Sequence, residues 1–355
     1  MVDKDIIAHS RPTLGPDEAQ AVSEVIESGY VAEGEKVKNF ERAFADFLGA
    51  DYAMSTNSGT SALHLTLLAM GIGPGDEVII PSYVCSALLN AVNYTGATPI
   101  LADIDPDTYN LDVSDVRRRI NTFTKAIIVP HLFGLAADME SLLGLDVPIV
   151  EDCAQSIGAA NHQGPVGLLG TAGVFSFYAT KMITTGEGGM VTTDSRDIAE
   201  RIRDLKAYDK RPDYKIRFNS KMNDIQAALG IVQLKKLGSF IRRRREIAER
   251  YNRAFESFQL KLPPTDTGHI YYRYVLGLKM DAGPWIQELA LKGITGERPI
   301  HVPLHQSLKL GGYPAAAKAW QQSLSIPIYP TLTDDNISRV VESVTRCYEK
   351  FSKLI

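Results

Sequence analysis

The feature that most constrains the fold is a series of short apolar runs separated by segments long enough for a helix. These runs are Glu77–Ile80, Thr98–Leu101, Ala126–Val129 and Pro148–Val150. They lack the alternation of a half-exposed strand, and such runs are typical of parallel strands buried on both faces of a sheet. Parallel strands need crossover connections, which are usually helices. The sequence therefore predicts an α/β layer.

Helical patterns accompany these runs at both ends of the chain. Near the N-terminus, residues 17–28 and 36–48 are expected to be helices. The second has an apolar stripe of Val37, Phe40, Phe44 and Phe47. The segment from Asp224 to about Phe258 contains no proline, and we expect one long helix there.

A smaller unit is expected after this long helix. Its predicted elements are a strand, a helix and a terminal helix, at 271–276, at 284–292 and from Asp334. A chain of 355 residues can bury a substantial core. We expect a large domain of residues 1–240 and a smaller α/β domain of residues 241–355. The N-terminal segment is a candidate to pack on the smaller domain.

A lysine in a glycine-rich bend is the strongest chemical signal. An alternating strand at 174–178 delivers Lys181 toward Gly186, Gly188 and Gly189. Desolvation by aromatic side chains and backbone favours the neutral amine, which can attack an aldehyde to form an imine. Taken alone, a surface lysine at a strand end would be the simpler interpretation. Two further segments change that interpretation.

These segments are the acidic end of a buried strand and a glycine turn at the start of a helix. Asp152 follows the last apolar run, and Gly59-Thr60 opens a helical apolar pattern. The free N–H groups and positive dipole end of such a turn form a phosphate site. Candidate phosphate ligands are the N–H groups of Gly59 and Thr60 and the hydroxyls of Thr60 and Ser176. Phosphate site, buried acid and imine-forming lysine together are what pyridoxal 5'-phosphate (PLP) requires.

The chain resembles, over nearly its full length, the sugar aminotransferases of the DegT/DnrJ/EryC1/StrS family. The matching blocks are 57–63, 73–79, 130–134, 151–155, 175–189, 219–222 and 226–228. Each block is weak alone, and their common order makes the match specific. The resemblance implies the aspartate-aminotransferase-like fold of fold type I PLP enzymes, with a large mixed, mostly parallel sheet domain and a smaller α/β domain. It also implies a homodimer with composite active sites.

Roles for cofactor-binding residues follow from the resemblance. Lys181 would bind the cofactor covalently and, once released, carry a proton between substrate and cofactor. Asp152 would keep the pyridine nitrogen protonated; its alternative role is a helix cap. Gln155 would point at the ring's 3-oxygen, unless it is a loop amide facing water. Asn219 is expected to reach the phosphate from the partner subunit; its alternative role is to cap the helix beginning near Asn223.

Two positions depart from the family pattern. Many relatives stack an aromatic residue on the cofactor ring where our alignment places Cys85. Either another ring such as Tyr83 substitutes, or the smaller Cys85 contacts that face; a buried cysteine packing as a small hydrophobe is the alternative. Relatives often carry arginine where Lys221 stands. A lysine offers a point charge rather than a bidentate fork, so recognition of a nucleotide phosphate would be altered.

Substrate-binding candidates are His131, Glu187, Lys221 and His305. The two histidines are expected as pocket walls or packing residues rather than acid–base groups, and Glu187 is either structural or substrate-facing. Arg217 is expected to face a substrate diphosphate together with Lys221. Glycines 186, 188 and 189 would let the backbone pass close to the cofactor. Neither the scattered histidines nor the three cysteines have metal-site spacing, so no metal is expected.

Composition argues against several other classes of protein. With a net charge of −4, the chain gives no sign of nucleic-acid binding. The run Arg242–Arg245 is followed by Glu246 and Glu249, which favours a solvated helix face. No stretch approaches the roughly 20 apolar residues of a membrane span. The N-terminus lacks the apolar core of an export signal. A cytoplasmic location is therefore expected.

Three functional hypotheses remain from the sequence. The first is an aminotransferase that moves an amino group from an amino acid, expected to be L-glutamate, to a nucleotide-linked keto sugar for polysaccharide or glycan biosynthesis. A 4-keto-6-deoxy sugar is preferred, with a 3-keto sugar or a cyclitol as alternatives. The second is a PLP-dependent sugar dehydratase, and Lys181 argues against it because those relatives usually carry histidine there. The third, a non-catalytic regulator, leaves the set of Lys181, Asp152 and phosphate site unexplained.

Overall fold

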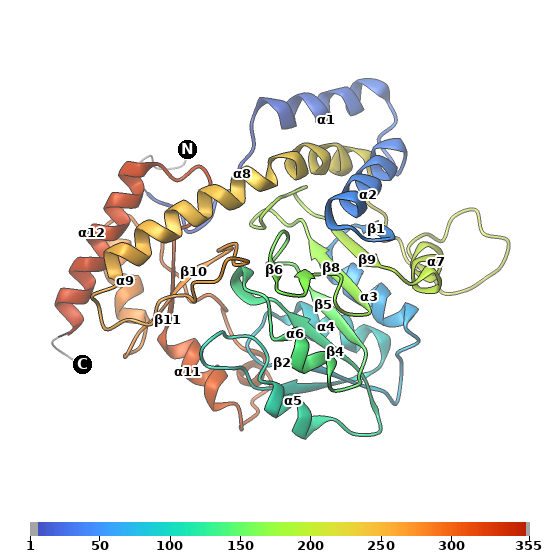
Figure 1. The fold of residues 1–355 in the computed structure, drawn as a ribbon. Coiled ribbons are helices and arrows are strands. Elements are labelled where there is room, and N and C mark those ends of the chain that lie inside the picture. Colours follow the sequence, from blue (N-terminus) through green and yellow to red (C-terminus); the bar gives the residue numbers. More distant parts are fainter. Residues whose placement is uncertain (1–5, 353–355) are drawn as a thin grey trace.

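The larger part of the molecule is built on a seven-stranded sheet (Figure 1). The computed structural model describes residues 6–352, so Met1–Asp5, part of the segment in which no export signal is expected, lie outside it. The strand order is β1-β9-β8-β5-β4-β2-β3. The strands are β1 (Tyr52–Thr56), β2 (Glu77–Pro81), β3 (Thr98–Ala102), β4 (Thr124–Pro130), β5 (Ile149–Asp152), β8 (Ala172–Ser176) and β9 (Gly189–Thr193). Only β9 runs against its neighbours. The expected mixed, mostly parallel sheet is confirmed.

Both faces of this sheet are buried, which explains the unbroken apolar runs. Ile79 and Ile127 belong to a core on one face, whereas Val78 and Ile128 belong to a core on the other. All four side chains are fully buried. The helices α3 (Gly59–Ala69), α4 (Ser86–Thr95) and α7 (Arg196–Leu205) supply apolar residues to the second core. The helices α5 (Val113–Arg119) and α6 (Met139–Leu143) supply the first.

Two N-terminal helices pack along α8 (Asp224–Phe255), and the second also packs against β1. They are α1 (Pro16–Ser28) and α2 (Glu35–Leu48), close to the expected ranges. Phe40 and Phe44 of α2 are fully buried against Phe175 and Phe177. Phe47 departs from the expected stripe because its side chain faces outward and is 44% exposed. A short 3₁₀ turn, η1 (Leu132–Gly134), and a small hairpin, β6 (Ala160–Asn161) with β7 (Gly164–Pro165), complete this part.

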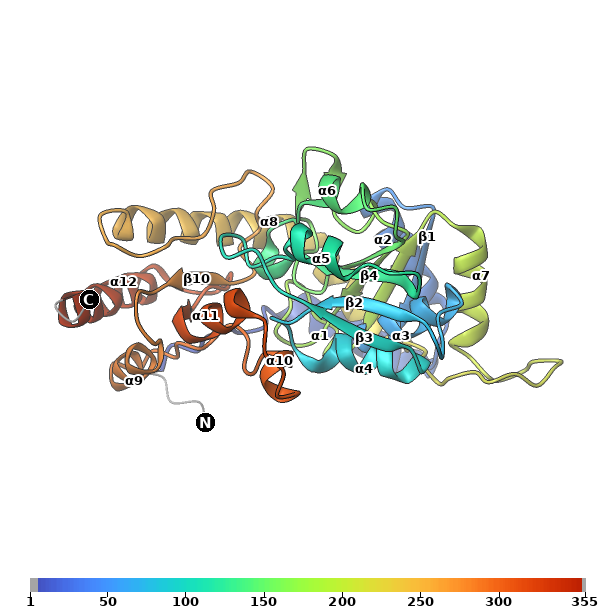
Figure 2. The same cartoon turned by 90° about the horizontal axis from the view of Figure 1, so that it is seen from below.

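One continuous helix, α8 (Asp224–Phe255), joins the sheet to the C-terminal part, as Figures 1 and 2 both show. Its residues up to Phe240 pack in the same core as α2, whereas those from Ile247 onward pack in a separate core around Trp285. The expected domain boundary at residue 240 therefore lies inside a helix. Ile7 pairs with Ile294 and packs in the second core.

The C-terminal part combines a two-stranded antiparallel sheet with four helices. Its elements are β10 (Tyr274–Gly277), β11 (Ser323–Ile326), α9 (Gly283–Leu291), α10 (Leu304–Ser307), α11 (Pro314–Gln322) and α12 (Asp334–Phe351). The helix α11 packs against the larger sheet's core through Ala316 and Ala319. The carboxylate of Asp103, just after β3, accepts hydrogen bonds from the Ala315 and Ala316 N–H groups. The two parts are therefore in direct contact.

The arginine run on α8 corrects one expectation. Arg244 is buried rather than solvated, with 3% of its surface exposed. Its guanidinium donates to the backbone carbonyls of Tyr271, Tyr272 and Ile328. Burial lowers the pKa of Arg244 to about 10, so it remains a cation at neutral pH. A run of four basic residues cannot reveal from spacing alone which member points inward.

Candidate active site

The predicted phosphate loop lies between the ends of β1 and β8. The helix α3 begins at Gly59, and the Ser58 hydroxyl accepts a hydrogen bond from the Ser61 N–H at its N-terminus. A Cβ atom placed on Gly59 would lie 2.8 Å from the Ser176 Cβ atom. Gly59 thus allows the helix start to approach Ser176 closely. This brings together Gly59, Thr60 and Ser176, and the first-turn N–H groups have no partner within the helix.

The glycines after Lys181 serve close packing beside this loop. Gly189 of β9 lies between Thr56 and Ser176 in strand register. A Cβ atom on Gly189 would lie 2.5 Å from the Ser58 carbonyl oxygen, and one on Gly188 would lie 2.4 Å from the Thr185 hydroxyl. Their observed role is therefore contact with neighbouring protein. Gly186 has a φ of 79°, a backbone conformation that favours glycine.

Asp152 ends β5 at the same edge of the sheet. It is 8% exposed, and its Oδ1 accepts a hydrogen bond of 3.0 Å from the Ala154 N–H. Burial raises the pKa of Asp152, and the nearby positive charge of Lys181 partly opposes this. A buried carboxylate of this kind gains most from a cationic partner such as a protonated pyridine nitrogen. Gln155 accepts a 3.0 Å hydrogen bond from the Phe133 N–H through Oε1, which leaves its NH₂ group as a donor.

Lys181 lies beside a tyrosine that sequence reasoning did not select. Its backbone N–H closes a turn onto the Tyr178 carbonyl, and its Nζ is 5.4 Å from the ring centre of Tyr272. Burial alone raises the pKa of the Tyr272 phenol, but the positive charges of Lys181 and Arg273 lower it to about 8. The site therefore contains a second titratable group next to the lysine. In the sequence, the only signal at Tyr272 was its position in a predicted strand, which gave no indication of a role in the site.

Arg273 is the second residue that sequence reasoning missed. Its guanidinium carbon is 5.1 Å from the Tyr272 ring centre, and its Nη1 contacts the His9 ring. Among residues 6–352, Arg273 forms no ion pair with a carboxylate. Glu297 is connected to Arg273 only through His9, with which its carboxylate is paired at 3.0 Å. A cation without a directly bound acid thus contacts the same tyrosine ring as Lys181.

His131 takes part in a buried hydrogen-bond network. The side chain is fully buried, and its Nδ1 accepts a hydrogen bond from the Ala137 N–H. Its Nε2 therefore carries the proton and donates to Glu151 at 3.0 Å. The fully buried ring, with protein partners on both nitrogens, agrees with the expected packing role, and substrate binding by His131 stays a prediction.

Glu151 is the centre of this buried network. Its carboxylate also accepts hydrogen bonds from the N–H groups of Gly167, Leu169 and Gly170. Burial alone raises the pKa of Glu151, but the hydrogen bonds and the His131 contact outweigh it and lower the pKa below its usual range. Candidate ligand atoms of His131, Glu151 and Cys153 lie within 4.8 Å of one another. Protein donors already occupy this cluster's carboxylate and imidazole.

His305 and Cys85 lie close to the C-terminal end of strand β2. The Nδ1 of His305 contacts the Ser82 hydroxyl at 2.6 Å, so this buried ring fastens α10 to the residue after β2. Cys85 is exposed at the N-terminus of α4. Tyr83 is fully buried in the sheet core, which excludes it as a replacement stacking ring. The alternative that Cys85 is a buried cysteine packing as a small hydrophobe is wrong, because its side chain is exposed.

Asn219 lies beside the phosphate loop of its own chain. Its carbonyl accepts a 3.1 Å hydrogen bond from the Asn57 side chain, and the Asn57 N–H donates to the Ser220 carbonyl. The helix cap of α8 is Asn223, which forms a capping box with Gln226. Asn219 therefore does not cap that helix. Because this contact uses the Asn219 backbone and the residue is exposed, its side chain stays a predicted ligand of a partner's phosphate.

The charged side chains that were predicted to bind the substrate are either paired with other protein groups or exposed to solvent. Lys221 pairs with Asp209 at 2.9 Å, and this contact raises the pKa of Lys221. Arg217 pairs with Asp204 and Asp213. To bind a substrate diphosphate, both cations would have to be shared between these carboxylates and the phosphate groups. Glu187 is exposed, and its carbonyl accepts hydrogen bonds from the side chains of Thr185 and Gln226.

Comparison with known proteins decides the family. The model of the DegT/DnrJ/EryC1/StrS aminotransferase family matches residues 12–345. The chain belongs to this family. The spore coat polysaccharide biosynthesis protein SpsC of Bacillus subtilis is 36% identical, covering 95% of this chain and 96% of SpsC. The GDP-perosamine synthase of Caulobacter vibrioides is 35% identical, covering 97% of this chain and 99% of that enzyme.

A solved structure agrees with the family assignment. The PLP form of Spr1654 from Streptococcus pneumoniae superimposes with a TM-score of 0.91 at 27% identity, covering 97% of this chain and 99% of that one. The family member described here is a PLP-dependent aminotransferase, and PLP is its cofactor. The close contact of Gly59 with Ser176 places the Ser176 side chain beside the N-terminus of α3, where the first-turn N–H groups could bind a phosphate. Within residues 6–352, no helix has both the length and the apolar character needed to cross a membrane.

Proposed function

We propose that this aminotransferase transfers an amino group from L-glutamate to a nucleotide-linked keto sugar, with a 4-keto-6-deoxy sugar as the preferred acceptor. The observation that carries the proposal is the full-length similarity to GDP-perosamine synthase, 35% identical over 97% of this chain. The similarity to SpsC, whose name refers to polysaccharide biosynthesis, supports a role in polysaccharide or glycan formation. A 3-keto sugar or a cyclitol is the alternative acceptor. We also propose a cytoplasmic location.

The residues around the cofactor site divide the work among them. Bound PLP supplies an electron sink for the substrate carbon. Lys181 would hold the cofactor and then move the proton at the substrate carbon through Nζ. Asp152 would hold a proton on the pyridine nitrogen, and Gln155 would donate its NH₂ group to the ring's 3-oxygen. Tyr272 borders the path of the Lys181 amine, so its charge would influence proton transfer there.

Arg273 is the side chain best placed to bind the carboxylate of the amino donor. It is a cation on the same tyrosine ring as Lys181, and among the described residues no carboxylate is paired with it. A guanidinium binds a carboxylate through two parallel hydrogen bonds, which also orients the donor. Replacing Arg273 with lysine keeps the charge but removes this fork. We expect that variant to raise KM for glutamate about tenfold or more while KM for the sugar changes little.

The function is tested with purified enzyme, glutamate and a panel of nucleotide-linked keto sugars. Formation of 2-oxoglutarate, measured by a coupled dehydrogenase, should depend on one class of sugar. Lys181→Ala should abolish turnover, and borohydride reduction of wild type should place the cofactor on Lys181. If cyclitols or simple keto acids are aminated as well as any nucleotide sugar, the acceptor assignment is wrong. Release of a sugar hydroxyl without consumption of glutamate would instead indicate the dehydratase.

A homodimer is also proposed, and the connection between α7 and α8 supports it. This segment projects from the body of the molecule in both views (Figures 1 and 2). It carries apolar side chains at high exposure, namely Tyr208 at 55%, Tyr214 at 94% and Ile216 at 74%. Exposed apolar side chains gathered on one segment are typical of a surface that another chain covers.

A mixed-dimer experiment decides whether Asn219 acts within its own chain or across the interface. Lys181→Ala and Asn219→Ala subunits are mixed and allowed to exchange. If Asn219 serves the partner's site, each mixed dimer regains one complete site and activity returns. If the Asn219 side chain serves the site of its own chain, no site is complete and activity stays low. A fully active monomer by light scattering would refute the proposed dimer.

A further inference from the structure

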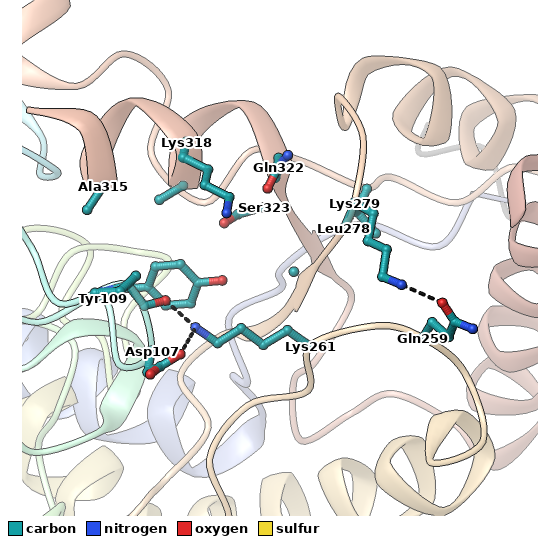
Figure 3. Close-up of a pocket in the computed structure, with 13 residues that line it drawn as sticks. Asp107, Tyr109, Gln259, Lys261, Leu278, Lys279, Ala315, Lys318, Gln322 and Ser323 are labelled. Carbon is teal, nitrogen blue, oxygen red and sulfur yellow. Dashed lines mark hydrogen bonds and ion pairs between the residues drawn. The ribbon is translucent and has the colours of Figure 1, made fainter. Parts of the chain in front are cut away.

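A cavity of about 410 Å³ opens between the larger sheet and the C-terminal part, away from the cofactor site. Loop residues Pro106 to Tyr109 line one side, and the end of β10 and one face of α11 line the other (Figure 3). We name it the β10–α11 cavity. Its volume is in the range of small-molecule sites in proteins. None of the residues assigned to PLP or to the substrate lines it.

The base of this cavity holds an unsatisfied hydroxyl. Ser323 is 1% exposed, lines the cavity, and its Oγ has no hydrogen-bond partner. The phenols of Tyr83 and Tyr109 are close by, but Oγ makes no hydrogen bond of normal geometry with either. A buried hydroxyl without a partner costs roughly 1–3 kcal/mol. Oγ is covered by its neighbours, so it adds polarity to the base of the cavity rather than an open contact.

The rim of the cavity is positively charged. Three lysines, Lys261, Lys279 and Lys318, line it together with a single carboxylate, that of Asp107. Lys261 uses that carboxylate at 3.1 Å and also donates to the Pro106 carbonyl. Lys279 donates to the neutral Gln259 side chain. Among residues 6–352, Lys318 has neither an ion pair nor a hydrogen bond. The rim therefore retains about two uncompensated positive charges.

The cavity is separate from the site around Lys181. Tyr272, which borders Lys181, precedes β10, whereas the cavity is lined by Gly277 at the other end of that strand. The four residues of β10 alone span roughly 10 Å. Ser323 pairs with Gly277 in the antiparallel register, so it lies at the same distal end.

We propose that the β10–α11 cavity binds a small phosphate-bearing molecule, with Lys279 and Lys318 on its phosphate. Ammonium groups are mobile point charges with three donors, which suits a tetrahedral phosphate better than a planar carboxylate. The ligand would touch both the 106–109 loop and the C-terminal part, so its binding would hold the two parts together. This proposal does not depend on which sugar the enzyme aminates.

The test uses PLP-loaded enzyme, so that the cofactor already fills its own phosphate loop. Inorganic pyrophosphate and inorganic phosphate are titrated separately in a calorimeter at constant ionic strength. Wild type should bind pyrophosphate more tightly than phosphate and show a higher Tm with it. Lys318→Ala and Lys279→Ala should each weaken pyrophosphate binding roughly tenfold or more, because each removes a charge-assisted hydrogen bond. Lys292→Ala, at an exposed lysine outside the cavity, is the matched control.

Lysine acetylation with and without pyrophosphate locates the bound anion. Protection of Lys279 and Lys318 supports the proposal, and unchanged turnover in Lys318→Ala shows that this variant is folded. The proposal is overturned if the holoenzyme binds neither anion, or if both cavity variants bind as wild type does. It is also overturned if Lys221 is protected and Lys221→Ala abolishes binding, since the anion would then occupy the proposed substrate diphosphate site.

Discussion

Removing the charge of Lys181 should raise the pKa of Tyr272 by about two pH units. The lysine Nζ is 5.4 Å from the Tyr272 ring centre. With the tyrosinate charge taken at that centre and an effective dielectric constant of about 20, the attraction is about 3 kcal/mol. One pH unit corresponds to about 1.4 kcal/mol, so the shift is about two units. Tyr272 ionises at about 8 in the wild-type fold, where burial opposes the cations, and should ionise near 10 in Lys181→Ala.

The assay is ultraviolet difference absorbance of tyrosinate on cofactor-free protein, because covalent PLP would neutralise the lysine. Wild type should show one tyrosine ionising near pH 8, ahead of the others. Tyr272→Phe should remove that step, which assigns it. Lys181→Ala should move the step upward, and Lys181→Arg should keep it because the positive charge remains. An early step that persists unchanged in Lys181→Ala would refute the electrostatic coupling.

Three further perturbations test the rest of the site. Asp152→Asn should lower turnover by roughly two or more orders of magnitude with little change in unfolding midpoint; near-normal turnover would mean that Asp152 is only a cap. Gly59→Ala places a Cβ atom 2.8 Å from Ser176 and should weaken PLP binding, measured by absorbance titration, whereas Gly311→Ala, with no atom within 4 Å, should not. The fold lowers the pKa of Glu151 below 4.5, so its ionised form stabilises the protein above that pH and the contribution is lost as the pH falls through the lowered value. Glu151→Gln should therefore unfold at lower urea than wild type at pH 7, and the gap should narrow in acid; a pH-independent gap would contradict the linkage.

The sequence was a good guide wherever a residue's place follows from the end of a strand. Asp152 and Ser176 end parallel strands, and Gly59 opens the helix after another, so one edge of the sheet must gather them. The four apolar runs identified β2, β3, β4 and β5, the last of which ends at Asp152. Local patterns were therefore sufficient for the α/β layer and for the outline of the cofactor site, whereas the aspartate-aminotransferase-like fold was implied by the family resemblance.

Local sequence patterns could not predict the contacts between distant segments of the chain. Tyr272 and Lys181 are 91 positions apart in the sequence, and no local pattern around either residue predicts their contact. His131 matched a family block, but only the fold shows that Glu151 and Ala137 occupy both of its ring nitrogens. Lys221 was expected to meet a diphosphate, and its pairing with Asp209 depends on the path of the loop between them.

The continuity of α8 limits how this enzyme can open and close. A hinge needs a few residues whose backbone can change conformation, and a hydrogen-bonded helix does not offer them without breaking. Because α8 belongs to one core through Phe240 and to the other from Ile247, the C-terminal part cannot swing freely about residue 240. Any adjustment on substrate binding should be a small sliding of α11 and the 106–109 loop past each other, at the very place where the β10–α11 cavity lies.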